Sequence, residues 1–130
     1  MAERSRDWFR PAEADLRHAR NAREDADYNW SAFASHQAAE KAMKAVFHRR
    51  HLDAWGHTLS VLLENLPQDF RPPTELMHHA KQLDQHDAPS LRPSGFERGA
   101  PVDFYTGREA DLAVSNAEAI LEWCRRQVAR

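Results

Sequence analysis

The chain has little cysteine, no long apolar run and no marked excess of one charge. Its single cysteine, Cys124, excludes a disulfide framework within the chain and suits a reducing cytoplasm. No stretch approaches the roughly 20 apolar residues of a membrane span, and the opening MAERSRDWFR lacks the apolar run of a signal peptide. Eighteen basic and twenty acidic residues leave a net charge of −2, which gives no whole-surface electrostatic reason to expect nucleic-acid binding.

Alternating strand patterns are also missing, and apolar residues recur at helical spacing through most of the chain. The length of 130 residues fits one domain with one core, which we place over residues 1–130. Helices are predicted around the stripe Trp8 to Ala19, from Tyr28 to Arg50, and over 59–66, 72–86 and 106–130. The predicted fold class is all-α, an antiparallel bundle of four to five helices with one long loop before the last helix.

Two helix starts carry capping signals, and one connection is unusually long. Thr58 precedes LSVLLENL and is expected to cap that helix, while Thr106 and Glu109 form a Thr-x-x-Glu capping box. Residues 87–105 contain three prolines and two glycines, so they cannot continue a helix. A loop of this length is expected to be mobile or to be shaped by a neighbour.

The segment 33–51, FASHQAAEKAMKAVFHRRH, is apolar around most of its circumference yet carries four polar side chains. Such a helix is expected at the centre of the bundle, in contact with several helices and open to a second subunit. Gln37, Glu40, Lys41 and Lys44 lie within about one stripe, with Glu40 and Lys44 at i, i+4. Two interpretations stay open: a structural network, or a patch that presents Lys41 and Lys44 to a nucleotide phosphate.

Arg50 and His57 are the candidate catalytic pair, at Arg-x6-His spacing. A histidine can move a proton near neutral pH while an arginine stabilises a phosphate, which is the chemistry of metal-independent RNA cleavage. Arg71 and His78 repeat the spacing, and a chain with many arginines and eight histidines yields such pairs by chance. The spacing alone therefore does not identify a nuclease.

No metal and no cofactor are predicted. His48 and His51 have an i, i+3 offset, but no third ligand is fixed by spacing, so the histidines are interpreted as surface or capping groups. A phosphate-binding glycine loop and a nucleophile elbow are both missing from the sequence. Cys124 lies on the apolar stripe of the last helix and is predicted to be a small core residue.

The order of these features resembles the HEPN domain family over nearly the whole chain. An aromatic-led first helix, WFRPAEADLRHA, precedes YNWSAFASHQAAEKAMKAVF, whose QAAEKAMKA is the most specific part. GHTLSVLLENL and LMHHAKQLD follow, and then come a Pro/Gly loop, DFYT and a helix containing AEAILEW. The resemblance implies an antiparallel helical bundle that is commonly a homodimer, often paired with a small nucleotidyltransferase encoded nearby in a toxin–antitoxin-like module.

The resemblance also implies two classes of function. Some members are metal-independent RNases that use an Arg-x4–6-His motif, and this motif generally belongs to a later helix than the one that ends at Arg50. Other members are viewed as nucleotide- or protein-binding modules. The expectation for this chain is the binding role as a nucleotidyltransferase partner. The alternative is an endoribonuclease toxin that uses Arg50 and His57.

Four residues are the candidates for binding a nucleotide or a protein partner. The family's loop often reads Arg-Tyr-Pro, and Leu91-Arg92-Pro93 stands at the equivalent place in this chain. Arg92 therefore joins Gln37, Lys41 and Lys44 as a binding candidate.

Overall fold

The structure is a computed structural model that describes residues 3–70, 72–86 and 98–129. Its elements are α1 (Ser5–Glu24), α2 (Tyr28–Arg49), α3 (Leu59–Glu64), the 3-10 turn η1 (Gln68–Phe70), α4 (Thr74–Leu83), the 3-10 turn η2 (Asp84–His86), α5 (Pro101–Phe104) and α6 (Gly107–Ala129). The described ranges contain no strand, so the predicted all-α class is confirmed. No helix within them is long and apolar enough to cross a membrane.

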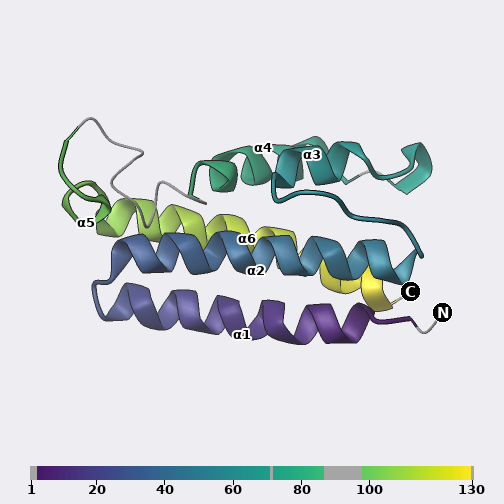
Figure 1. Cartoon of the computed structure of the whole chain (residues 1–130), viewed down its shortest axis with the longest axis horizontal. Helices are drawn as coiled ribbons and strands as arrows, with labels where there is room; N and C mark the ends of the chain where they lie inside the picture. The colour runs from purple at the N-terminus through teal and green to yellow at the C-terminus, as the bar shows by residue number, and fades with distance from the viewer. Residues whose placement is uncertain (1–2, 71, 87–97, 130) are drawn as a thin grey trace.

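Three long helices form the body of the molecule, with α3 and α4 side by side along it (Figure 1). α1 runs antiparallel to both α2 and α6, and the Arg20 guanidinium meets Glu118 of α6 at 2.6 Å. α2 and α6 run parallel, because the chain returns through α4 before α6 begins. At their carboxyl ends the Arg49 side chain donates a hydrogen bond to the Val128 carbonyl at 3.1 Å.

The central position predicted for the second helix is confirmed. α2 contacts α1, α3, α4, α5, η2 and α6, and its alanines Ala38, Ala39, Ala42 and Ala45 are fully buried. Small side chains let the neighbouring helices approach closely, so polar groups on α2 must find partners within narrow spaces. Cys124 is buried in α6 as predicted.

The capping of α3 differs from the prediction. Thr58 stands at the N-cap position, but its hydroxyl makes no capping hydrogen bond. Asp84 of η2 takes that role: its carboxylate accepts the N–H groups of Leu59 at 2.6 Å and Ser60 at 3.1 Å. The Ser60 hydroxyl also donates to Asp84 at 2.7 Å. The Asp84 carboxylate, from the turn η2, thus caps α3 in place of the Thr58 hydroxyl.

The stretch before α6 agrees with the prediction only in part. Glu109 accepts the Thr106 N–H at 3.1 Å, which is the carboxylate half of the predicted capping box. Residues 98–105, expected to be loop, include the short helix α5. The remainder of the expected loop, 87–97 with Arg92, lies outside the described residues, so its expected mobility stays a prediction.

Candidate functional site

Glu40 and Lys44 of α2 form a polar cluster with His57 of the segment that follows this helix. Lys44 Nζ lies 2.9 Å from Glu40 Oε2, and His57 Nδ1 lies 2.8 Å from the same oxygen. Only 6% of Glu40 is exposed, and its Oε1 has no hydrogen-bond partner among the described residues. The segment between α2 and α3 folds back along α2, which brings His57 to a residue well inside that helix. The pairing of Glu40 with Lys44 matches the structural-network interpretation.

The candidate catalytic residues have separate partners. Arg50 follows the last turn of α2, and its guanidinium lies over the Phe70 ring, 3.9 Å from the ring centre. The His57 side chain is 69% exposed while its Nδ1 contacts Glu40. With a proton on Nδ1, that nitrogen donates to the carboxylate and Nε2 is left as an acceptor. Within the described ranges no hydrogen bond or ion pair joins Arg50 to His57.

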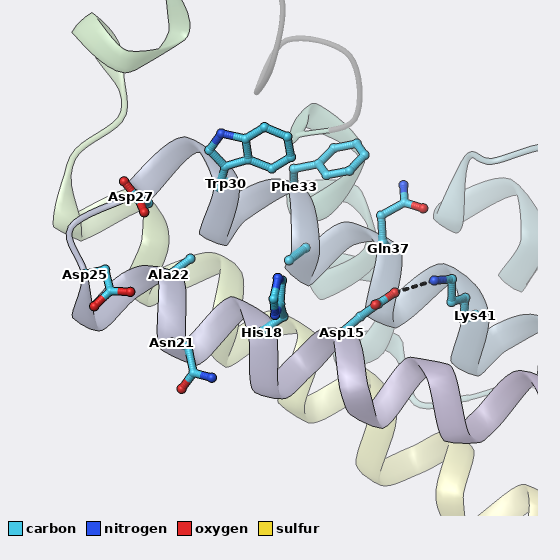
Figure 2. A pocket seen from close by; sticks show the side chains of 11 residues that line it. Asp15, His18, Asn21, Ala22, Asp25, Asp27, Trp30, Phe33, Gln37 and Lys41 are labelled. Carbon is cyan, nitrogen blue, oxygen red and sulfur yellow. Dashed lines mark hydrogen bonds and ion pairs between the residues drawn. The ribbon is translucent and has the colours of Figure 1, made fainter.

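Gln37 and Lys41 line a groove of about 530 Å³ between α1 and α2, shown in Figure 2. Lys41 Nζ lies 2.6 Å from Asp15 Oδ2 of α1. The whole lining, which we name the α1/α2 groove, is Asp15, His18, Asn21, Ala22, Asp25, Asp27, Trp30, Phe33, Ala34, Gln37 and Lys41. Trp30 is 55% exposed and stands edge-to-face to Phe33 with ring centres 6.1 Å apart.

Lys44 does not share this groove. It borders a second hollow of about 340 Å³ with Trp8, His48 and residues 52–55. The Trp8 and His48 rings stack there at 5.6 Å, and Lys44 Nζ lies 5.6 Å from the Trp8 ring centre. The predicted binding stripe is therefore divided: Gln37 and Lys41 lie together, Lys44 faces another surface, and Arg92 lies outside the described residues.

Sequence reasoning missed the aromatic and acidic parts of the α1/α2 groove. Trp30 and Phe33 are spaced i, i+3 near the start of α2, and this spacing is a usable signal for a shared face. Asp25 and Asp27 were visible only as part of a polar run between helices. Nothing in the sequence indicated that this run lies beside the two aromatic rings.

Further polar contacts join α4 to α6, and η2 to Tyr105 between α5 and α6. His79 Nδ1 lies 2.7 Å from the Asn116 side-chain oxygen, and the Asn116 amide donates to Gln82 at 2.8 Å. His86 Nδ1 lies 2.9 Å from the Tyr105 hydroxyl. Burial lowers the pKa of His86, with His36 adding to the effect, and burial raises the pKa of Tyr105. These contacts fasten helices together, which is a structural role.

Other titratable groups offer little reactive chemistry. Burial raises the pKa of the Cys124 thiol far above its usual range, so this thiol is not a nucleophile near neutral pH. Across 3–70, 72–86 and 98–129, no three His, Cys, Asp or Glu side chains gather in an arrangement that could hold a metal ion.

Comparison with known proteins gives a consistent result. Residues 5–127 match the family described as HEPN domain. TT1696 from Thermus thermophilus is 37% identical with a TM-score of 0.94, covering 97% of this chain and 99% of that one. ST0689, described as an archaeal HEPN homologue, is 36% identical with a TM-score of 0.84, covering 98% and 99%. A HEPN domain protein from Thermotoga maritima is 39% identical with a TM-score of 0.78, covering 95% and 98%. No protein of curated function matches the chain.

Proposed function

The chain belongs to the HEPN domain family, and on that premise we propose that it is the dimeric partner of a small nucleotidyltransferase in a toxin–antitoxin-like module. The observation that supports this binding role is that the two candidate catalytic residues contact different partners. Arg50 is stacked on Phe70, whereas His57 is hydrogen-bonded to Glu40. A phosphate-cleaving pair needs both groups directed at one substrate position. The α1/α2 groove, by contrast, offers exposed aromatic surface of the kind that binds partners.

The binding candidates divide in the same way. Gln37 and Lys41 line the groove and are proposed to contact the partner. Lys44 is proposed to act structurally, because its ammonium group pairs with the buried carboxylate of Glu40. Arg92 stays a prediction from the sequence.

The experiment that tests the proposal begins with the neighbouring reading frame, which should encode a small nucleotidyltransferase. That protein and the tagged chain are expressed together and passed over a gel-filtration column. We expect one stable complex of fixed stoichiometry. Two separate peaks at micromolar concentrations of both proteins would contradict the partner role.

A second candidate function is metal-independent RNA cleavage, and one observation favours it. The hydrogen bond from His57 Nδ1 to Glu40 orients the imidazole ring, as a carboxylate orients the histidine of a catalytic triad. His57 Nε2 would then take the proton of the attacking hydroxyl, and Arg50 would stabilise the charge on the phosphate. Because His57 is largely exposed, an RNA strand could approach its ring.

RNA cleavage in the presence of a chelator decides between the two candidates. If His57 is catalytic, cleavage persists without metal and falls by roughly 10²–10⁴ in His57→Ala. Arg50→Lys should also lose activity, because an ammonium group does not replace a planar bidentate donor. We expect instead that wild type and His57→Ala show the same residual activity, which would eliminate the catalytic assignment.

A further inference from the structure

The α1/α2 groove has aromatic and acidic groups that lack cationic partners within the described part of the chain. No cation lies over Trp30 or Phe33, and Asp25 and Asp27 form no ion pair there. Elsewhere the same chain covers its aromatic rings with cations: Arg50 lies 3.9 Å from the centre of Phe70. Cation stacking on aromatic rings is thus a contact that this protein uses, and arginine is the side chain best suited to it.

The charge of the groove favours a cationic occupant. Its lining contains three aspartates and one lysine, and Lys41 is held by Asp15 at 2.6 Å. Figure 2 shows this ion pair at one end of the groove, while Asp25, Asp27 and Trp30 lie toward the other. A nucleotide phosphate would face carboxylates at that second end, where it would be repelled. A guanidinium would find carboxylate acceptors and a π face there.

We propose that the α1/α2 groove binds an arginine side chain from a basic segment of a different protein. The guanidinium stacks on Trp30, and the carboxylates of Asp25 and Asp27 at the same end of the groove attract its positive charge. The groove volume of about 530 Å³ admits the rest of a short segment along Phe33 and Ala34. This inference rests on the proposed function in taking the occupant to be a protein partner, but it does not require that the partner be a nucleotidyltransferase.

We take the occupant to be a different protein because the described arginines of α1 nearest the groove make contacts elsewhere. A two-fold interface needs the arginine and the groove on one patch. Arg20 and Arg23, which lie on α1 near the groove, already approach α6, at 2.6 Å from Glu118 and 3.7 Å from Asp111. Arg10 and Arg17 line a separate hollow on α1 and not the groove.

The test uses the whole protein labelled with ¹⁵N, with the Trp30 indole signal assigned from the Trp30→Phe variant. The probe is a synthetic peptide, acetyl-Ala-Arg-Ala-Arg-Ala-amide. Its control replaces both arginines by citrulline, which has nearly the same shape without the charge, and adenosine monophosphate is the third titrant. We expect the arginine peptide to shift the Trp30 signal in a saturable way, while the citrulline peptide and the nucleotide leave it unchanged.

Two variants give effects of opposite sign. Asp25→Asn combined with Asp27→Asn should weaken peptide binding by about tenfold, because each exposed ion pair contributes roughly threefold to the affinity. Lys41→Gln should strengthen it, because Asp15 is released and a positive charge is removed. A nucleotide-phosphate site predicts the reverse for Lys41→Gln. Weaker peptide binding in that variant, equal binding of both peptides, or a Trp30 shift with the nucleotide would overturn the inference.

The failure of this inference is distinguishable from failure of the proposed function. The peptide titration is independent of the nucleotidyltransferase, and an unchanged Trp123 indole signal in the double aspartate variant is the check on folding. If the arginine peptide does not bind while the wild-type chain forms the complex, the groove inference is wrong and the proposed partnership stands. If the peptide binds but no complex forms, the partnership is wrong and the groove inference stands. If light scattering shows that the variant changes from dimer to monomer, the groove is a self-contact and the inference is also wrong.

Discussion

At the scale of single residues, the two lysine–carboxylate pairs of α2 differ mainly in burial. Lys44 and Glu40 have side chains that are 14% and 8% exposed, whereas Lys41 and Asp15 are 32% and 27% exposed. Water screens the second pair more, so its loss leaves a charge that can be solvated. The loss of Glu40 would leave the Lys44 ammonium group largely buried without its partner.

The first prediction compares Glu40→Ala with Asp15→Ala. Glu40→Ala should lower the free energy of unfolding by about 3 kcal/mol, since it breaks a buried pair and removes the acceptor of His57. Asp15→Ala, the matched control, should cost about 1 kcal/mol or less. Urea unfolding followed by circular dichroism measures both. Equal losses in the two variants would refute a special role for burial.

The second prediction concerns His86 and pH. Its pKa is lowered by burial, so the folded state binds fewer protons than the unfolded state below the ordinary histidine pKa. Above the ordinary histidine pKa, His86 therefore does not make the free energy of unfolding depend on pH. As the pH falls below that value, His86 lowers the free energy of unfolding. His86→Gln should lose less stability than wild type between neutral and mildly acidic pH, as measured by thermal unfolding. Parallel losses in both proteins would show that other groups cause the acid sensitivity.

At the scale of elements, α3 is a helix of only six residues that is stabilised by contacts with other elements. A helix this short is not stable alone in water, so its position depends on tertiary contacts. Leu59 and Leu62 bury its inner face, and Asp84 satisfies two N–H groups of its first turn. The cap is thus also a tie between α3 and η2.

The third prediction compares Asp84→Ala with Thr58→Ala. The aspartate variant should lower the free energy of unfolding by about 1–2 kcal/mol, the usual cost of removing a helix cap. The threonine variant should change it little, since the Thr58 hydroxyl makes no capping bond. Guanidinium unfolding of both proteins under identical conditions is the measurement. A larger loss in Thr58→Ala would reverse the assignment of the cap.

The sequence predicts helices well and tertiary partners poorly in this chain. The periodic stripes located the long helices, because burial of one face repeats along the chain. The cap from Asp84 was missed because a partner 25 residues away leaves no local pattern. Gln37 and Lys44 share a stripe on a helical wheel, but Gln37 lies in the α1/α2 groove, while Lys44 lies beside Trp8 and the folded-back segment 52–55.

At the scale of the whole molecule, several large apolar side chains are exposed, and the fourth prediction concerns what covers them. Trp55, Val61, Val102 and Leu112 are each 44% exposed or more. Membership of the HEPN domain family supports the expectation of a homodimer, and these four side chains, which lie on different segments, are candidates for its interface. Light scattering at tens of micromolar protein should give about twice the chain mass of 15.0 kDa. A mass of one chain under those conditions would contradict it.

The opposite directions of α1 and α6 place the start of the first helix beside the end of the last, as Figure 1 shows. Arg125 of α6 lies over the ring of Phe9 in α1, 5.4 Å from its centre. The turn that carries Asp25 and Asp27 is at the far end of α1. An affinity handle or a surface attachment at either terminus would therefore hold the molecule by one end and leave the Asp25 and Asp27 end of the α1/α2 groove far from the support.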